Sequence, residues 1–432
     1  MRISFVSLRL GGLIYKGGNN GLTTITLIFI LVYIGMILGG FPYLKIGRPA
    51  IALVGAVALI AGHHISGSET LECVDFGTLA LLFGLMLLSI QFEMSGLYTY
   101  LSRRVGHYQV SPFILLGLLT ALAGGLSAFL TNDVIAVAMT PVVLGLCVEK
   151  KLNPVPFLLG IAFATNSGAV ATLVGSPQNI LISQKLNLSF GAFTLYTAVP
   201  ALLSLLAGWL LLSWFNRKSW VLETPSGQTD ERMKMPEVKL DVAEMVKGLI
   251  VAAIVIWLFV FTEHDKGLVA VTAGCFLLMN GRFASKEMLG RIDWGLLLLF
   301  FGLFVVNSAM NSTGLPQVFV NDLSKAGFQL QHPAVLFTVT AVLSDIVSNV
   351  PGVMLLLPYA TDPLSGPLMA IASGLSSNMI IIGSLANIIV VDAAASRGLK
   401  ISFWDFAKVG IPAGLISMLL GALWIMAAHC LR

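Results

Sequence analysis

The chain has 432 residues, of which 57% are hydrophobic and 11% are charged, and its mean hydropathy is +0.91. Soluble domains carry about 25% charged residues, so this composition excludes a soluble globular protein and indicates an integral membrane protein. The formal net charge of +4 does not suggest a nucleic-acid partner, because loop charges in such proteins set the orientation in the membrane.

The first half of the chain predicts membrane-spanning helices after a tail at residues 1–20. Residues 112–148 exceed the 20 or so residues of one crossing and are interrupted by Thr131-Asn132-Asp133, so we expect a re-entrant helical hairpin. Residues 154–184 are also apolar and are broken at Gly175-Ser176-Pro177-Gln178-Asn179. The remaining expected elements of this half (21–215) are spans at 21–40, 50–62, 76–92 and 192–215 and a connector at 93–111.

The second half repeats this order of elements. A polar stretch at 216–244 is the expected cytoplasmic linker, and the second half then covers 245–432. It contains an expected hairpin at 333–362 and a broken span at 366–392. Its other expected elements are spans at 246–262, 267–281, 293–311 and 407–429 and a connector at 314–332.

The two halves share short motifs at nearly constant offsets. The hairpin segment LSAFLTNDVIAVAMTP at 126–141 recurs as LSDIVSNVPGVMLLLP at 343–358. The break motif Gly-Ser-x-x-Asn at 175–179 recurs at 383–387. Five spans per half would invert the second half relative to the first, and most lysines and arginines then fall on the cytoplasmic side. The predicted fold class is therefore an all-α polytopic membrane protein built as an inverted repeat of two five-span halves, each with a hairpin and a broken span.

Hairpin tips and helix breaks expose backbone N–H and C=O groups at membrane depth, where they are tolerated only in a cavity or at a binding site. Helix N-termini suit an anion, whereas unwound carbonyls with Ser, Thr and Asn oxygens suit Na+. Each half could therefore offer one cation site. The candidate ion- and substrate-binding residues are Thr131, Asn132, Asp133, Gly175, Ser176, Asn179, Ser348, Asn349, Gly383, Ser384 and Asn387.

Asp133 is the sharpest candidate, because a carboxylate inside a membrane protein is costly and points to function. It could ligate Na+ or carry a proton. Its counterpart in the second hairpin is Val350, so the two sites differ chemically. Asp345 could supply the missing charge there, or could be a solvated or capping residue. The bland alternative is that these polar residues only join helices, but two matched hairpins, each followed by a matched break, favour a functional role.

The motifs at 126–141, 164–182, 343–351 and 383–390 resemble those of the ion transporter superfamily, and the resemblance extends over about 45–430. The superfamily includes arsenite permeases, citrate–metal transporters, sodium/proton antiporters and sodium-coupled dicarboxylate carriers. The resemblance implies a bacterial inner-membrane carrier, often a homodimer with elevator movement. Dicarboxylate carriers have Ser-Asn-Thr at both hairpin tips, whereas this chain has Thr131-Asn132-Asp133 and Ser348-Asn349-Val350. These tips are more similar to the arsenite and citrate–metal branch.

The sequence thus predicts a secondary active transporter for a small anion or oxyanion, coupled to Na+ or H+, in the inner (plasma) membrane. No cofactor is expected, and no metal beyond Na+. The alternative within transport is a Na+/H+ antiporter with Asp133 and Asp345 as proton carriers. A membrane enzyme is disfavoured because the chain has no HExxH motif or Gly-rich phosphate loop. A scaffold would have no use for two costly polar breaks.

Overall fold

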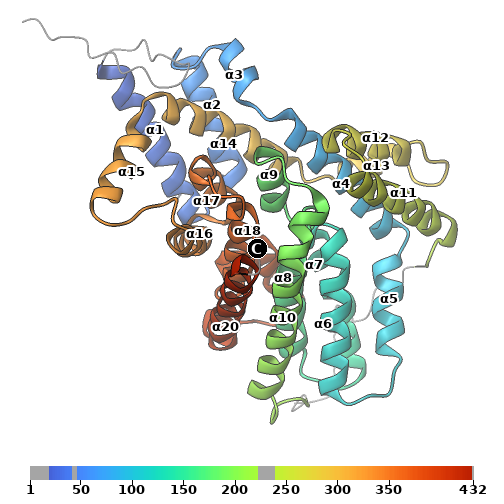
Figure 1. Ribbon diagram of the computed structural model, residues 1–432. Coiled ribbons are helices and arrows are strands. Elements are labelled where there is room, and N and C mark those ends of the chain that lie inside the picture. The colour runs from blue at the N-terminus through green and yellow to red at the C-terminus, as the bar shows by residue number, and fades with distance from the viewer. Residues whose placement is uncertain (1–18, 41–45, 222–238, 431–432) are drawn as a thin grey trace, which may run out of the picture. The chain divides into compact units, whose positions relative to one another are not determined.

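The computed structural model describes residues 19–40, 46–221 and 239–430, so most of the predicted tail (1–20) and linker (216–244) lies outside the described residues. Within these ranges the chain forms helices and loops, with two isolated β-bridges and no longer strand pairing. The described helices divide into two compact units, and each unit takes helices from both halves of the sequence. Figure 1 shows the elements along the chain.

The described part of the smaller unit contains five helices. They are α1 (Asn19–Leu38), α2 (Arg48–Ala61), α3 (Gly67–Cys73), α14 (Trp294–Ser312) and α15 (Leu315–Lys325). Helix α2 packs closely on α14, where a Cβ atom on Gly302 would collide with the backbone of Ala52. Tyr33 of α1 donates a 2.9 Å hydrogen bond to Asn307 Oδ1 of α14, which satisfies two buried polar groups.

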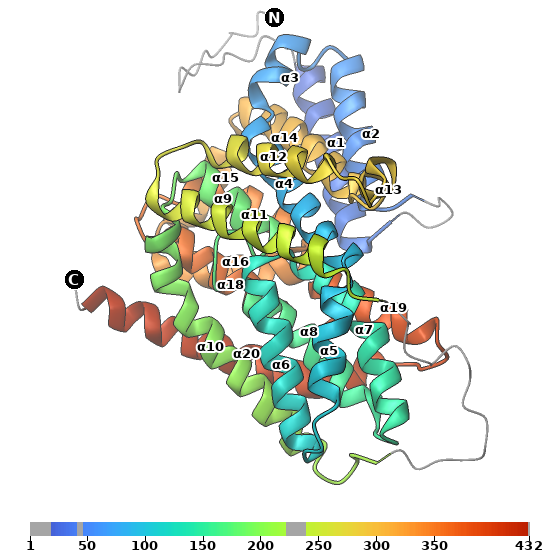
Figure 2. The same ribbon diagram turned by 90° about the vertical axis from the view of Figure 1, so that its right-hand side faces the viewer.

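The larger unit begins with helices from the first half. They are α4 (Phe76–Met94), α5 (Leu97–Gly106), α6 (Pro112–Phe129), α7 (Asn132–Glu149), α8 (Pro154–Ala169), α9 (Pro177–Lys185) and α10 (Phe190–Phe215). The central helix is α8, which packs against α6, α7, α10 and α19, and nearly all of its side chains are buried. Figure 2 shows α6 and α8 side by side.

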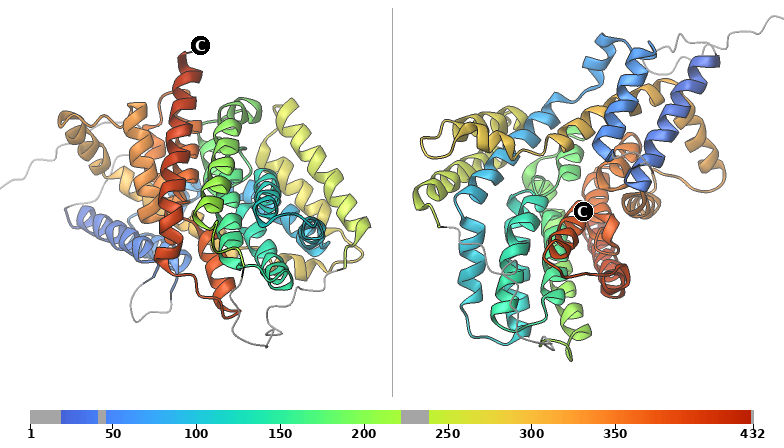
Figure 3. Two further views of the ribbon diagram at one scale, coloured as in Figure 1. Left: turned by 90° about the horizontal axis from the view of Figure 1, so that it is seen from below. Right: turned by 180° about the vertical axis from the view of Figure 1, so that it is seen from behind.

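The second half supplies the rest of the larger unit. These elements are α11 (Val242–Phe261), α12 (Lys266–Leu278), α13 (Ser285–Gly290), α16 (Pro333–Val347), α17 (Asn349–Leu356), η2 (Leu357–Tyr359), α18 (Ser365–Ser376), η3 (Ile381–Gly383), α19 (Leu385–Ala395) and α20 (Phe403–Cys430). The long helices α10 and α20, which end the two halves, pack against each other (Figure 3).

The repeat of the sequence is visible in matched packing contacts. In the larger unit, α4 packs on α12, where a Cβ atom on Gly84 would collide with the carbonyl of Ala270. The repeat relates this pair to the α2–α14 pair, because Gly84 corresponds to Gly302 and Ala270 corresponds to Ala52. Each of these helices therefore finds its close partner in the other half of the sequence.

The connectors after the matched spans also begin alike. Gly96 and Gly314 occupy equivalent positions in the two halves. Both adopt left-handed backbone, with φ of +78° and +74°, immediately before α5 and α15. Glycine adopts this conformation without the steric cost that a Cβ atom would add, so the repeat preserves the turn as well as the helices.

One helix lies on each side of every predicted hairpin tip and helix break, and the predicted fold class is confirmed. Helices α6 and α7 are separated only by Leu130 and Thr131, and α16 and α17 only by Ser348. Among the described residues, eight helices are long and apolar enough to span a membrane. Two predicted spans are shorter: α2 has 14 residues and α12 has 13. At about 1.5 Å per residue, each is shorter than the roughly 30 Å hydrocarbon core.

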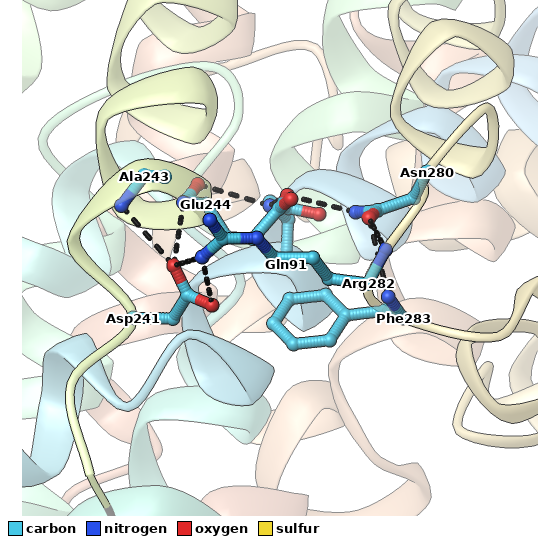
Figure 4. A network of polar contacts seen from close by, with 7 residues as sticks. All are labelled: Gln91, Asp241, Ala243, Glu244, Asn280, Arg282 and Phe283. Carbon is cyan, nitrogen blue, oxygen red and sulfur yellow. Dashed lines mark hydrogen bonds and ion pairs between the residues drawn. The ribbon is translucent and has the colours of Figure 1, made fainter.

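A polar network joins α4, α11 and the loop after α12 in the larger unit (Figure 4). The Gln91 amide donates two 2.9 Å hydrogen bonds to Glu244, one to its backbone oxygen and one to its carboxylate. Asn280 donates a third, of 2.8 Å, to the same carboxylate. Beside it, Arg282 forms a 2.6 Å ion pair with Asp241, which caps α11. The buried Glu244 therefore has hydrogen-bond donors that compensate for its removal from water.

Candidate ion-binding site at the two helix breaks

All eleven candidate residues lie in the larger unit, where each hairpin tip and each helix break can be placed. In the first half, the backbone N–H of Asn132 donates a 3.2 Å hydrogen bond to the carbonyl of Gly175. This bond holds the start of α7 against the break between α8 and α9. Gly175 has to be a glycine here, because a Cβ atom would collide with the backbone of Ala169.

Asn179, in the first turn of α9, closes the first break from the other side. Its Nδ2 donates 2.9 Å hydrogen bonds to the carbonyl oxygens of Ala169 and Thr172. Carbonyl oxygens can only accept, so these bonds fix which end of the amide is nitrogen. The Asn179 Oδ1 therefore points away from them, as an acceptor.

Three buried oxygens of the first break have no hydrogen-bond partner among the described residues. They are Asn132 Oδ1, Ser176 Oγ and Asn179 Oδ1, on residues that are 5%, 1% and 0% exposed. Buried polar groups are nearly always paired, and unpaired ones cost free energy. Three unpaired oxygens beside one backbone contact are a donor set that suits a small, hard cation such as Na+.

The second break has the same backbone plan. Asn387 donates through Nδ2 to the carbonyls of Ser377 (2.7 Å) and Ile380 (3.1 Å). When the two Gly-Ser-x-x-Asn motifs are aligned, these acceptors are the counterparts of Ala169 and Thr172. Ser384 precedes α19 with φ −142° and ψ 145°, close to the −148° and 152° of Ser176 before α9. The motif therefore builds the same local structure twice.

The equivalent side-chain oxygens of the second break, on Asn387, Ser384 and Asn349, are engaged, unlike those of the first. Asn387 Oδ1 accepts a 2.9 Å hydrogen bond from Asn166 Nδ2. Ser384 Oγ donates a 2.8 Å bond to Asn166 Oδ1. Asn349 Oδ1, the counterpart of Asn132 Oδ1, accepts a 3.0 Å bond from Ser377 Oγ.

The remaining candidates occupy the hairpin tips and their neighbours. Thr131 donates through Oγ1 to Ser89 Oγ at 3.2 Å, so its hydroxyl links the tip of the first hairpin to α4. Ser348 has φ +79°, a strained value for a residue with a side chain. Asp133 lies in the first turn of α7 and is half-buried.

Asp345 lies on α16 beside the second break. Its Oδ1 is buried without a hydrogen-bond partner among the described residues. A Cβ atom on Gly383 would lie 2.9 Å from that oxygen. The structure thus brings Asp345 to the second break, as its proposed role there requires.

Sequence reasoning missed Asn166, Ser377 and Ser89 as residues of these sites. Asn166 was visible as an asparagine inside the apolar run 154–184, but the repeat offered no counterpart for it, because the matching residue in the second half is Gly374. No three His, Cys, Asp or Glu side chains gather as a metal site within the part of the chain that the structure describes.

Comparisons with known proteins agree with this architecture. An uncharacterized transporter of Mycobacterium bovis is 28% identical over 415 residues, which cover 88% of this chain and 94% of that protein. The silicon efflux transporter LSI3 of Oryza sativa subsp. japonica is 26% identical over 450 residues, covering 88% and 92% of the two chains. The crystal structure of the Alcanivorax borkumensis YdaH transporter matches with a TM-score of 0.58 at 13% identity, covering 94% and 96%, and so shares the fold.

The family assignment follows from the sequence itself. A family model described as "Citrate transporter" (CitMHS) matches residues 25–368, which is most of the chain and includes both hairpins. The resemblance to the ion transporter superfamily is thereby confirmed, and the family consists of transporters rather than enzymes. The chain is a multi-pass plasma-membrane transporter, and it belongs to the citrate transporter (CitMHS) family.

Proposed function

We propose that this transporter carries a small oxyanion, or its neutral acid or metal complex, together with Na+. The observation that carries the proposal is the set of three buried, unpartnered oxygens of Asn132, Ser176 and Asn179 at the first break, within the described residues. A cation bound there would satisfy all three and compensate for their removal from water. The donor set is neutral, which suits a monovalent ion.

The substrate class follows from what the two breaks lack. The motif segments 126–141, 164–182, 343–358 and 383–392 contain no lysine or arginine. An anion would therefore be held by helix N-termini, backbone amides and the co-bound cation. Asp133 would repel a multiply charged anion, which favours a neutral acid such as arsenous or silicic acid, or citrate complexed with a divalent metal. The family description and the rice relative support these candidates.

We further propose that transport proceeds by an elevator movement. All eleven candidate residues lie in a single compact unit that contains both hairpins and both broken helices. Such a unit can carry a complete binding site as one body, so that the site itself need not be rebuilt during transport. A homodimer would provide a fixed frame for that movement.

The test is ligand-induced thermal stabilisation of the purified protein, because a ligand that binds the folded state raises its melting temperature. The panel comprises arsenite, silicic acid, citrate with Mg2+, succinate, sulfate and phosphate, each with Na+ or with K+ at two pH values. We expect one solute to stabilise the protein only in Na+. Stabilisation by Na+ and by pH with no response to any solute would instead support the antiporter, with Asp133 and Asp345 as proton carriers.

A further inference from the structure

We infer that the second break binds no metal cation, because the side chain of Asn166 takes the place that a cation would hold, so that each chain binds a single Na+ at the first break. The inference rests on the proposed function and specifies its ion stoichiometry. It starts from the difference between two breaks that share one backbone plan.

The orientation of the amides follows from the backbone. Asn387 Nδ2 donates to two carbonyl oxygens, so Asn387 Oδ1 has to be the end that faces Asn166. Asn166 must then present its Nδ2 group to Asn387, at 2.9 Å, and to Asn378 Oδ1, at 3.1 Å. An N–H donor, which carries partial positive charge, therefore lies where a cation would meet the Asn387 oxygen.

The Asn166 side chain is fully bonded and firmly held. Its Oδ1 accepts from Ser384 Oγ, so both ends of its amide are used, and the residue is 3% exposed. Asn378 continues the network by donating to Ser167 Oγ at 3.0 Å. From there hydrogen bonds of 2.8 Å run through Ser204 to Ser417 on α20. A buried network that is satisfied in this way resists rearrangement, so a cation could not easily displace the amide.

The repeat explains why the first break has no such amide. The counterpart of Asn166 is Gly374, which has no side chain to offer to Ser176 and Asn179. The α8–α18 packing also leaves no room for one, because a Cβ atom on Gly374 would collide with Val170. Val170 is itself the counterpart of Asn378. Both members of the asparagine pair are thus absent from the first break.

A second position produces the same difference at the hairpin tips. The hydroxyl of Ser377 lies 3.0 Å from Asn349 Oδ1 in the second half and 2.7 Å from the carbonyl oxygen of Ser373, and shares its one proton between these acceptors. The counterpart of Ser377 is Ala169, whose methyl group cannot donate, and Asn132 Oδ1 has no hydrogen-bond partner among the described residues. Two positions, one on α8 and one on α18, therefore account for all three unpartnered oxygens.

Asp345 does not restore a metal site to the second break. Its buried Oδ1 supplies one oxygen beside Gly383, whereas a hard cation requires several oxygen ligands. The neighbouring Asn349, Ser384 and Asn387 side chains are already engaged. A lone carboxylate of this kind can take up a proton without any further ligand, which fits the role in proton transfer considered for it.

The test is equilibrium binding of ²²Na+ to the purified full-length protein, with matched variants at equivalent positions. We expect one Na+ per wild-type chain. Asn132→Ala should weaken binding by about 10-fold or more, the loss expected when a ligand worth about 1.4 kcal/mol is removed. Asn349→Ala should leave the affinity within about 2-fold. If Asn349→Ala does not fold, Ser384→Ala serves in its place, because it removes the second-break hydroxyl that is equivalent to that of Ser176.

The outcomes separate this inference from the function on which it rests. Two Na+ per chain, or equal losses in the two asparagine variants, would overturn the inference and leave Na+-coupled transport standing. A folded wild-type protein that binds no Na+ would overturn the coupling itself. Asn166→Gly, which copies the residue at position 374, should raise the stoichiometry above one. A folded Asn166→Gly protein that still binds a single Na+ would overturn the assignment of Asn166.

Discussion

The first and second helix breaks use the same motif and the same backbone hydrogen bonds, yet they present different chemistry. Asn179 and Asn387 both bind two carbonyls of the preceding helix. The Oδ1 of Asn179 has no partner within the described chain, whereas that of Asn387 is bonded to Asn166. The comparison shows that the motif supplies the frame of each break, and that residues outside the motif determine which of its side-chain oxygens are already hydrogen-bonded.

The largest expected effect is a difference in stability between Asn166→Ala and Asn132→Ala. Asn166→Ala leaves Asn387 Oδ1 and its neighbours buried without partners, at about 1–3 kcal/mol for each group. We expect the free energy of unfolding to fall by about 2–4 kcal/mol on this basis. Asn132→Ala removes an acceptor that is already unpartnered, so in Na+-free buffer its stability should stay close to that of the wild type. Thermal unfolding in detergent without Na+ measures both.

An equal loss of stability in these two variants would contradict the distinction between the breaks. Repeating the measurement in high Na+ makes the distinction between the two breaks clearer, because only a protein with an intact first break should gain stability from the ion. Asn166→Ala retains that break and should still respond to Na+, whereas Asn132→Ala should not.

The next effect comes from making the first break like the second. Ala169→Ser places a hydroxyl at the position equivalent to Ser377, where it can donate to Asn132 Oδ1 as Ser377 donates to Asn349. The new hydrogen bond competes with the ion, and a net hydrogen bond of about 1 kcal/mol corresponds to a roughly 5-fold loss of Na+ affinity. ²²Na+ binding gives the value. Ser377→Ala, which removes the equivalent hydroxyl from the second break, is the matched control and should leave the Na+ affinity unchanged. A change in affinity in that variant would show that the second break also contributes.

A smaller effect is expected for Asp133→Asn. The carboxylate follows Asn132 directly, and its attraction for Na+ through partly solvated surroundings is on the order of 1 kcal/mol. Na+ affinity should therefore fall severalfold while the ion stoichiometry is unchanged.

Asp345→Asn should leave Na+ affinity intact and alter only the pH dependence of transport. An unchanged pH profile in a folded Asp345→Asn protein would remove Asp345 as a proton carrier.

The smallest effect is expected away from both breaks, at Asp241→Asn. The hydrogen bond from Arg282 holds the pKa of Asp241 below its usual value, together with backbone N–H groups at the start of α11. A lowered pKa in the folded state contributes stability above the unfolded pKa of about 3.9, and that contribution is lost as the pH falls through the folded value. The variant should be slightly less stable at neutral pH, and the difference should vanish in acid and shrink with salt. A melting-temperature series across pH and salt checks this, and Na+ affinity should not change.

Much of the fold was predictable because motifs that recur at a nearly constant offset mark the equivalent elements in both halves of the sequence. The polar tip at Thr131-Asn132-Asp133 and the Gly-Ser-x-x-Asn breaks marked the hairpins and broken spans, and the structure places helix ends there. The orientation of the halves in the membrane remains a prediction. The short lengths of α2 and α12 were already visible in the sequence, because the apolar runs expected at 50–62 and 267–281 are shorter than a full span.

The difference between the two breaks could not be predicted from the repeat. Comparison of equivalent positions treats each half by itself, but Asn166 of the first half acts on Ser384 and Asn387 of the second. The apolar segment 154–184 gives no indication of which helix Asn166 faces. Ser377 was missed for the same reason. A serine just before a break cannot be distinguished from the other polar residues of the break until its partner, Asn349, is known.

The close pairing of α2 with α14 and of α4 with α12 has a consequence for biosynthesis. The Gly302–Ala52 and Gly84–Ala270 contacts each join a helix from the first half to a helix from the second. As the ribosome proceeds from the N-terminus, α2 and α4 enter the bilayer without their partners and must wait until the second half has been translated. Lipid or the insertion machinery therefore has to cover these closely packing surfaces until α12 and α14 have been inserted.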